Sequence, residues 1–440
     1  MPAKSGEIMK ILWVCNTLPS EISEQLFNKA VISGGWITGM AGELVKNGEA
    51  ELVYAGGSPY CKDYITEKFD NLKYYIFPSG KSCGELSEYF LSLLNNEKPD
   101  LVHIFGSEYI HAYSMICACE QYGIIGRTII SIQGLVSVCA KHYCSGIPIN
   151  ELKRKTLRDY LRKGGILNGQ KRFKKAGEYE IKAIEKAEHI IGRTDWDYIC
   201  TKRLNRNVQY HFCNETLRNA FYSPQKWNYG SCHKHTIFAN YGGHIVKGFH
   251  FLLEAMPDIL KVYPDTMLYV TGSNPLDANG FMAQQRQTNY VNYIGRLIKK
   301  YHLESRIVFT GLLSEEEMRK QYLNANVFVS ASVIENSPNS VGEAMLLGTP
   351  VVVSDVGGVK NLLAHGTEGY VYQGNAPYML AGYVMKIFEL EDKAELISEN
   401  AILHAEKIYN KENNYKQLME IYNSVYSNNY EEVQRELITV

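Results

Sequence analysis

The segment of residues 335–358 contains the side chains best suited to chemistry. Two carboxylates, Glu335 and Glu343, are separated by seven residues, and turn-forming residues lie between them at the start of a helical pattern. Such a turn leaves backbone N–H groups free at the helix N-terminus, where these groups and the helix dipole together attract anions. We therefore expect a binding site for a diphosphate, formed around Asn336, Ser337, Asn339 and Ser340.

A second candidate is Lys247, which precedes a glycine at an expected junction between a strand and a helix, with Gly243 earlier in the same loop. A lysine there can neutralise the negative charge that builds up on a leaving phosphate group. Structural alternatives exist for each of these charged residues. Lys247 could be a solvated lysine at a helix start, Glu335 an ordinary loop carboxylate, and Glu343 the acid of a capping box that starts at Ser340.

These residues need strands and helices to position them, and the hydrophobic pattern predicts such a scaffold. Residues 10–15 form a continuous apolar run, as in strands that are buried on both faces of a parallel sheet. Strands and helices then alternate until a stretch of turn-forming residues near 223–231, after which the alternation resumes. The expected strands are residues 10–15, 50–55, 101–105, 128–132, 190–192, 235–239, 266–270, 307–309, 327–330 and 350–354. This alternation predicts two doubly wound α/β domains with parallel sheets.

The composition limits the classes of protein to which the chain can belong. Its 440 residues are enough for two domains, and 46 basic residues nearly balance 47 acidic ones, so no overall attraction to nucleic acid is expected. No apolar run approaches the roughly 18 residues of a membrane-spanning helix. Since the ten cysteines lack the spacing of a zinc site, we expect free thiols, no metal site and a cytoplasmic protein.

In these two segments the sequence resembles glycosyltransferase family 4, whose members are two-domain enzymes of the GT-B fold. The family has a basic residue followed by a Lys-Gly pair, and Lys247 occupies the place of that lysine. It also has two glutamates with seven residues between them, then alanine, a Gly-Pro-like pair and a glycine-rich turn. The matching residues here are Glu335, Glu343, Ala344, Gly348 with Pro350, and Gly357 with Gly358.

The resemblance implies a retaining transfer of a sugar from a UDP- or GDP-linked nucleotide sugar to an acceptor hydroxyl, without a cofactor or a metal ion. Glu335 would approach the hydroxyls of the transferred sugar, and Lys247 would contact the diphosphate, so these two are the expected catalytic residues. Glu343 would hold the donor ribose.

The resemblance also implies a fold, namely two doubly wound Rossmann-like domains that face each other across a cleft. Residues 1–229 would form the acceptor-side domain and residues 230–410 the nucleotide-sugar-binding domain. Residues 411–440 would form a helical segment that packs back on the N-terminal domain.

Some positions depart from the family pattern. Gly242 stands where the family has an arginine, five residues before the lysine, and His244 or Arg193 could supply the missing charge. Gln133 stands where many members have a histidine, and glutamine can hydrogen-bond a sugar but cannot titrate. The family also has a strand that ends in histidine, which is His103 here. We therefore expect His103, Gln133 and Arg193 on the acceptor side.

Gly34 and Gly35 precede an expected helix and resemble a glycine pair of the family that faces the interdomain cleft. Only glycine lets the backbone come close to a phosphate or a sugar, so we expect both residues to bind the donor. A plain turn would leave the same pattern.

Residues 153–175 are unusually basic, with ten Lys or Arg side chains and one acid, Asp159. Leu152, Leu157, Tyr160 and Leu161 could share one face of a helix there. We expect this segment to contact an anionic membrane or a lipid-diphosphate acceptor, because each base near such a surface contributes about 1 kcal/mol. A solvated surface helix is the alternative.

The residues of the 335–358 segment, together with Ile132-Gln133-Gly134-Leu135, most resemble enzymes of bacterial cell-surface polysaccharide synthesis, so we expect a role there or in glycoconjugate synthesis. The expected partners are a nucleotide-sugar donor and a glycan or lipid-linked acceptor, and not nucleic acid. The expected location is the cytoplasm, with peripheral contact to the inner face of the membrane through residues 153–175. Two other classes stay open: a sugar-nucleotide epimerase of the same fold, and a nucleotide-sugar-binding protein without activity, which Gly242 and Gln133 would suit.

Overall fold

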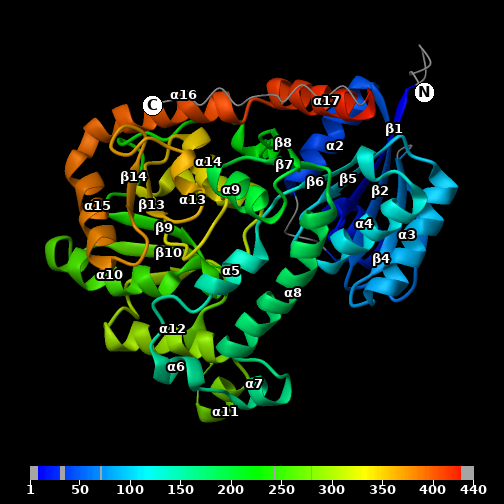
Figure 1. The fold of residues 1–440 in the computed structure, drawn as a ribbon. Helices are drawn as coiled ribbons and strands as arrows, with labels where there is room; N and C mark the ends of the chain where they lie inside the picture. The colour runs from blue at the N-terminus through cyan, green and yellow to red at the C-terminus, as the bar shows by residue number, and fades with distance from the viewer. Residues whose placement is uncertain (1–7, 30–34, 70–71, 242, 279, 428–440) are drawn as a thin grey trace. The chain divides into compact units, whose positions relative to one another are not determined.

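The computed structural model describes residues 8–29, 35–69, 72–241, 243–278 and 280–427, which form two compact units (Figure 1). Unit 1 consists of the described parts of residues 1–137, 175–218 and 409–440, and unit 2 of those of 138–174 and 219–408. This division differs from a single boundary near residue 230. Residues 138–174 precede that boundary in the sequence but pack within unit 2.

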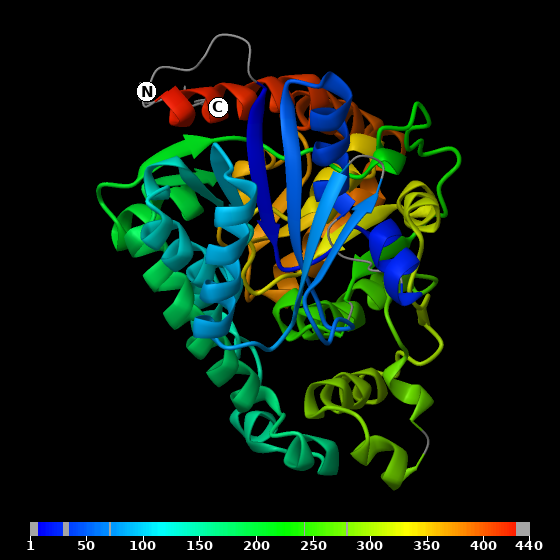
Figure 2. The same ribbon diagram turned by 90° about the vertical axis from the view of Figure 1, so that its right-hand side faces the viewer.

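Unit 1 is built on a sheet with the strand order β3-β4-β2-β1-β5-β6-β7-β8, in which β3 is antiparallel to β4 and the other described pairs are parallel. Figure 2 shows β1 in dark blue beside β2 in lighter blue. Its strands are β1 (Met9–Cys15), β2 (Ala50–Ser58), β3 (Ile65–Phe69), β4 (Leu72–Pro78), β5 (Leu101–Phe105), β6 (Thr128–Ser131), β7 (His189–Gly192) and β8 (Gln209–Phe212). Its helices are α1 (Ser20–Phe27), α2 (Gly35–Asn47), α3 (Cys83–Glu97), α4 (Ile110–Tyr122), η1 (Ile125–Arg127), α9 (Asp195–Leu204), α17 (Lys411–Ser427) and the latter part of α8 (Ile166–Lys186). The chain order of the strands reverses between the neighbours β1 and β5.

Unit 2 contains a sheet with the order β11-β10-β9-β12-β13-β14, in which every described pair is parallel. Its strands are β9 (Thr236–Asn240), β10 (Met267–Thr271), β11 (Ile307–Phe309), β12 (Val327–Ser330), β13 (Val351–Asp355) and β14 (Tyr370–Gln373). The chain order reverses between β9 and β12, which are neighbours in the sheet. Open α/β sheets bind ligands beyond the carboxyl ends of their strands at such a point.

Helices cover this second sheet and extend from it. They are α5 (Val136–His142), α6 (Ile149–Lys153), α7 (Leu157–Leu161), η2 (Asn219–Phe221), η3 (Ile245–Lys247), α10 (Phe249–Val262), η4 (Pro275–Asp277), α11 (Phe281–Gln285), α12 (Asn289–Lys300), α13 (Glu315–Asn324), α14 (Asn339–Leu347), η5 (Val359–Asn361), α15 (Pro377–Leu390), η6 (Glu391–Lys393) and α16 (Ala394–Ile408). The helices α5 and α8 each contribute residues to both units. Among the described residues, no helix is both long enough and apolar enough to cross a membrane.

Each unit has its own hydrophobic core, because the apolar strands of its sheet are buried under helices. In unit 1, Trp13 of β1 is fully buried and its indole N–H donates a hydrogen bond to the hydroxyl of Tyr422 at 3.0 Å. This contact fastens α17 to the sheet of unit 1. In unit 2, Ile237 of β9 and Val329 of β12 pack with Leu253 of α10.

Every strand that the sequence predicts is present, and its ends lie within a few residues of the expected ones. The strands that the sequence does not predict are β3, β4, β8 and β14. Three of them, β3, β8 and β14, lie at sheet edges. An edge strand is covered on fewer sides, so it does not need the continuous apolar run that marks a buried parallel strand.

The basic segment 153–175 is not one helix. The chain leaves α6 at Lys153, forms the short α7 and begins α8 only at Ile166. Leu152 packs against the core of unit 2, whereas Leu157, Tyr160 and Leu161 are exposed. The expected single helical face is therefore wrong for Leu152, because the chain turns between α6 and α7.

Candidate active site

The residues predicted to bind the donor in unit 2 gather where the strand order reverses. The loops of residues 241–248 and 331–338 follow β9 and β12, and both leave the same edge of the sheet because these strands are parallel neighbours. The Nζ atom of Lys247 lies 2.7 Å from Oε2 of Glu335, and the hydroxyl of Ser332 donates to the same oxygen at 3.1 Å. Both charged side chains are partly exposed, so a ligand can reach them.

Two glycines allow the chain to come this close. Gly248 has a φ of +63°, and a Cβ atom there would collide with the carbonyl oxygen of Ala331. Gly357 has a φ of +55°, and a Cβ atom there would collide with the carbonyl oxygen of Glu335. That same carbonyl accepts a hydrogen bond from the N–H of Gly358 at 3.1 Å. The glycines after Lys247 and at 357–358 thus fix the backbone on which Glu335 stands.

Glu343 lies in the first turns of α14 with its side chain almost completely buried. Its Oε2 atom accepts a hydrogen bond from the hydroxyl of Tyr322 at 3.3 Å. The residue before α14 is Pro338, and no side chain caps the helix. The capping-box alternative is therefore wrong: Ser340 already lies inside the helix and does not cap it.

The other residues predicted around the diphosphate surround the N-terminus of α14. Asn336 is buried, while Ser337, Asn339 and Ser340 are half-buried, and the last two form the first positions of the helix. Helix N-termini attract anions, so this arrangement suits the predicted phosphate site.

The loop before Lys247 supplies little charge of its own. Gly242 lies outside the described residues, and Gly243 is exposed with a φ of +77°. Desolvation and the neighbouring Lys247 cation lower the pKa of the His244 imidazole below the ordinary value of 6.5. A histidine with a lowered pKa is mostly neutral at pH 7. His244 therefore does not replace the absent arginine with a permanent charge.

In unit 1, two of the residues predicted on the acceptor side converge on a third. Arg193 forms a buried ion pair with Glu215 at 2.7 Å, and the amide of Gln133 donates a hydrogen bond to the same carboxylate. Arg193 and Glu215 have side chains that are only 6% and 8% exposed. Arg193 thus has a carboxylate partner within unit 1.

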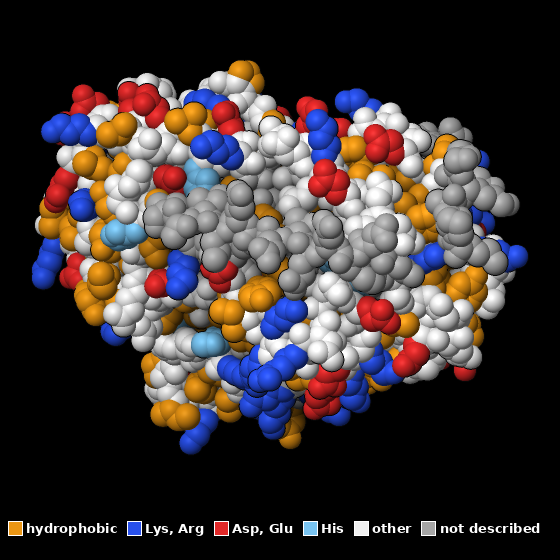
Figure 3. Space-filling model, turned by 45° about the horizontal axis from the view of Figure 1, so that its top comes forward, with side chains coloured by type: hydrophobic (Ala, Val, Ile, Leu, Met, Phe, Trp, Pro, Cys, Tyr) orange, Lys and Arg blue, Asp and Glu red, His pale blue; other side chains and the backbone are white. Residues whose placement is uncertain are grey.

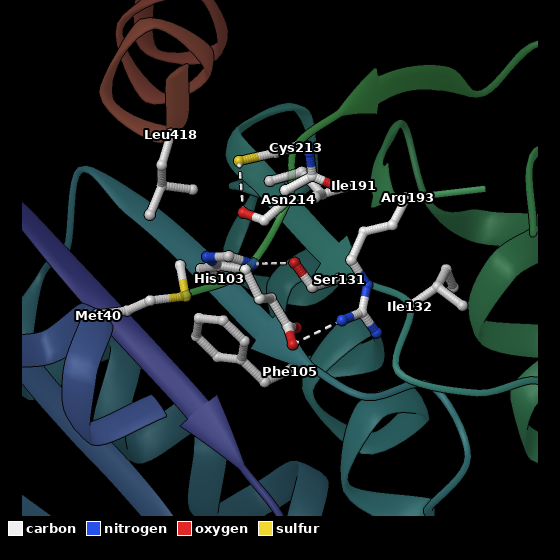
Figure 4. Close-up of a pocket in the computed structure, with 11 residues that line it drawn as sticks. Met40, His103, Phe105, Ser131, Ile132, Ile191, Arg193, Cys213, Asn214 and Leu418 are labelled. Carbon is white, nitrogen blue, oxygen red and sulfur yellow. Dashed lines mark hydrogen bonds and ion pairs between the residues drawn. The ribbon is translucent and has the colours of Figure 1, made fainter. Parts of the chain in front are cut away.

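Arg193 and Glu215 line a small cavity in unit 1 that His103 also borders, and His103 is fully buried (Figure 4). Its two ring nitrogens lie 2.6 Å from the hydroxyls of Ser131 and Tyr422. Burial lowers the pKa of His103 to about 3, so the imidazole is neutral at physiological pH. The cavity has a volume of about 10 Å³, too small for a sugar. His103 therefore supports Ser131 rather than carrying a proton to a substrate.

Two carboxylates in unit 1 were not singled out from the sequence. Glu215 follows β8, a strand that the sequence did not predict, so nothing marked it. Glu108 comes soon after β5, at the point where the strand order of unit 1 reverses, and its place after a predicted strand was a usable signal. Desolvation raises the pKa of Glu108 from 4.5 to about 8, and its Oε2 atom is buried. A carboxyl with such a pKa is protonated at pH 7.

The glycine pair of the N-terminal half is only partly described. Gly34 lies outside the described residues, and Gly35 is the first residue of α2. Their expected contact with the donor stays a prediction.

Comparisons with known proteins agree with the geometry of unit 2. Residues 235–404 match the family model of the glycosyl transferases group 1. The putative glycosyltransferase YtcC of Bacillus subtilis is 28% identical over 181 residues, which are 41% of this chain and 42% of that protein. The chain thus matches about two-fifths of the length of such curated relatives.

Solved structures resemble almost the whole chain. Sucrose-phosphate synthase from Thermosynechococcus elongatus has a TM-score of 0.69 at 16% identity, over 95% of this chain and 100% of that one. HepE from Anabaena, in complex with UDP-glucose, has a TM-score of 0.65 at 15% identity, over 94% and 100%. At such identities the likeness concerns the fold. The expected GT-B fold with two Rossmann-like domains is confirmed, as is the resemblance to glycosyltransferases of that fold.

Proposed function

We propose that this protein is a glycosyltransferase that moves a sugar from a nucleotide diphosphate sugar to an acceptor hydroxyl. The proposal is supported by the GT-B fold and by the match of residues 235–404 to the group 1 glycosyl transferases. The transfer retains the anomeric configuration, as the resemblance to family 4 implies. The observation that carries the proposal is the ion pair of Lys247 and Glu335 beside the N-terminus of α14.

In this reaction the ion pair exchanges its partners when the donor binds. Lys247 turns its charge to the diphosphate and, with the backbone N–H groups at the start of α14, stabilises the negative charge of the leaving group. Glu335 then accepts hydrogen bonds from the hydroxyls of the transferred sugar. Because this positive charge comes from the chain itself, we propose that the transfer needs no metal ion.

Glu343 holds the ribose of the donor in this proposal. Its carboxylate lies deep beside Tyr322, whose hydroxyl also donates to the carbonyl of Ser340 at 3.2 Å. A carboxylate fixed in this way can accept hydrogen bonds from both ribose hydroxyls. The donor is first of all a UDP-sugar, since the HepE structure holds UDP-glucose, and a GDP-sugar is the second candidate.

The acceptor is a glycan or a lipid-linked glycan in cell-surface polysaccharide or glycoconjugate synthesis, and the reaction takes place in the cytoplasm. Unit 1 provides the acceptor side through Gln133, Arg193 and the carboxylate of Glu215 that joins them. Glu108, at the switch point of the same sheet, lies close enough to these charges to be affected by them.

Peripheral contact with an anionic membrane belongs to the same proposal. On α7, Tyr160 is 75% exposed and Leu161 is 73% exposed, and on the neighbouring α11 Phe281 is 72% exposed. The two helices are joined by a hydrogen bond from the N–H of Leu157 to the side chain of Gln285 at 2.8 Å. Apolar side chains next to exposed bases are typical of a surface that inserts shallowly among anionic lipids.

The exposed bases continue along α8, where Lys171, Arg172, Lys174 and Lys175 reach the solvent. Lys and Arg side chains gather in the lower middle of the face shown in Figure 3. This concentration of positive charge in a nearly neutral chain favours an anionic partner.

The test is a thermal-shift screen of UDP- and GDP-sugars, followed by measurement of nucleoside diphosphate release with and without acceptor. A donor at about 100 times its dissociation constant should add about 2.7 kcal/mol to the stability of the protein. Acceptor-dependent release of the nucleoside diphosphate supports transfer. Change of the sugar without release would indicate an epimerase, and binding without turnover would indicate an inactive binding protein.

A further inference from the structure

A second cavity lies entirely within unit 2, beside the loop of residues 243–246 that leads to Lys247. It has a volume of about 340 Å³, within the range of small-molecule sites. Its walls carry three arginines: Arg158 on α7, Arg162 in the turn after α7, and Arg172 on α8. Three guanidinium groups around one cavity form a concentrated source of hydrogen-bond donors for an anion.

The segment that carries these arginines is firmly attached to the body of unit 2. The carboxylate of Asp159 accepts a hydrogen bond from the N–H of Asn289 at 2.7 Å, and the hydroxyl of Thr156 donates to the carbonyl of Gln287 at 2.7 Å. The side-chain amide of Asn289 also donates to the carbonyl of Glu151 at 2.6 Å. These bonds join α6 and α7 to the start of α12, so the backbone that carries Arg158 and Arg162 is held in place.

The acids of the same segment already have partners. Glu151 forms ion pairs with Arg154 and Arg296. Asp159 lines the cavity, but it is buried and its carboxylate accepts hydrogen bonds from the backbone N–H groups of Thr156 and Asn289. Within the part of the chain that the structure describes, Arg158, Arg162 and Arg172 have no ion pair with a carboxylate. The cavity is therefore positively charged in a chain whose formal net charge is −1.

The turn after α7 and the opposite wall complete the shape of the cavity. In the turn, Lys163 and Gly165 have φ values of +49° and +90°, and a Cβ atom on Gly164 would collide with the carboxylate of Asp159. This tight turn brings the start of α8 back beside α7. The rings of Tyr143 and Phe173 lie with centroids 4.9 Å apart and provide an aromatic wall. The cavity can thus hold an anionic group together with an apolar or planar part.

We propose that this cavity binds the phosphate or diphosphate group of a substrate through Arg158, Arg162 and Arg172. The site goes beyond the proposed donor site, because none of these arginines belongs to it. Since the donor and a lipid-linked acceptor both carry a diphosphate, the two sources share this chemistry. The cavity is also lined by residues 243–246 of the loop that leads to Lys247.

The experiment measures the affinity of the full chain for inorganic pyrophosphate, UDP and farnesyl diphosphate by calorimetry. The variant Arg158→Gln with Arg162→Gln and Arg172→Gln should bind pyrophosphate about tenfold more weakly or worse, because charge-assisted hydrogen bonds are lost. The matched control replaces Lys261, Lys320 and Lys393 by Gln, which removes the same charge from exposed positions of unit 2 outside both the cavity and the basic segment. It should change the affinity by less than about twofold, as screened surface charges do.

The other two ligands identify the source of the phosphate. A matching loss of UDP affinity in the arginine variant assigns the cavity to the donor diphosphate, whereas a loss for farnesyl diphosphate with unchanged UDP binding assigns it to the second substrate. Equal effects of the arginine and lysine variants, or no effect of either, would overturn the proposal.

Two further measurements keep the result unambiguous. The double variant Arg162→Gln with Arg172→Gln changes exposed residues only, so it tests the cavity even if the triple variant does not fold. Pyrophosphate binding needs no turnover, so it is independent of the proposed reaction. If a Lys247 variant loses sugar transfer but still binds pyrophosphate, the result bears on the proposed active site and leaves the proposed cavity site unaffected.

Discussion

The Nζ atom of Lys247 and the Oε2 atom of Glu335 lie 2.7 Å apart, although 88 positions separate the two residues in the chain. They meet because β9 and β12, the strands that precede them, are neighbours at the point where the strand order reverses. The two side chains can separate when a ligand binds, so that Lys247 contacts its anionic part and Glu335 its hydroxyl groups.

Replacing Lys247 by Met should lower kcat about 10²- to 10³-fold, with a smaller change in the KM of the donor. The reason is that, in the proposed reaction, the lysine stabilises charge that develops on the leaving group in the transition state. Steady-state kinetics of nucleoside diphosphate release measures both constants. Lys261→Met, an exposed change on α10, serves as the control and should leave both unchanged. A Lys247 variant with normal kcat would remove this residue from the mechanism.

Replacing Gly357 by Ala should destabilise the protein more than replacing Gly366 by Ala. Both glycines have positive φ, of +55° and +81°, so each substitution costs about 1–2 kcal/mol of backbone strain. Only at Gly357 does the added methyl group also collide with the carbonyl oxygen of Glu335, while Gly366 has no neighbour within 4 Å. Urea unfolding compares the two free energies, and equal losses would contradict the role of Gly357 as a spacer beneath Glu335.

Replacing Arg193 by Met should lower the free energy of unfolding by about 3–5 kcal/mol, because Glu215 then remains buried without its cation. Adding Glu215→Gln to the same chain should recover part of this loss, since the uncompensated charge is removed. Arg203→Met on the exposed side of α9 is the matched control and should have little effect. Chemical denaturation of the three variants and the wild type checks the expectation, which fails if Arg193→Met resembles Arg203→Met.

The stability of the protein should fall between about pH 4.5 and pH 8 through Glu108. Burial raises the pKa of this carboxyl from 4.5 to about 8, so in this range the native state keeps a proton that the unfolded state has released. Raising the pH therefore favours unfolding across this window. In Glu108→Gln this contribution disappears, and the melting temperature should decline less from pH 5 to pH 8 than in the wild type. Glu185→Gln, an exposed change on α8, should keep the wild-type profile.

Replacing Leu157, Tyr160 and Leu161 together by Ser should weaken co-sedimentation with vesicles that contain anionic lipid. These side chains are the exposed apolar part of the proposed membrane contact, and their removal takes away the area that would be buried among lipids. The same substitutions at Tyr378, Leu396 and Leu403, which are similarly exposed elsewhere on unit 2, provide a control of identical composition. Equal binding by both variants would refute the contact through α7.

Part of this arrangement could be read from the sequence because it depends on short-range patterns. A continuous apolar run such as residues 10–15 must be buried, and glycines such as Gly248 and Gly357 mark places where the backbone turns sharply or comes close to another chain segment. The motif around Glu335 and Glu343 indicated its position at the end of a strand in the same way. These features involve residues close together in the chain, so their spacing alone contains the information.

The tertiary structure decided which distant segments meet. Glu215 contacts both Gln133 and Arg193 only because β6, β7 and β8 are consecutive in the sheet. The strand β8 lacks the apolar pattern from which it could have been predicted. The basic segment packs within unit 2 and lines a cavity, a result that depends on bonds to α12 such as the one between Asp159 and Asn289. Such long-range pairings are set by the packing of the whole unit. The sequence therefore determined the loops that carry Lys247 and Glu335, and the fold determined which charges come together.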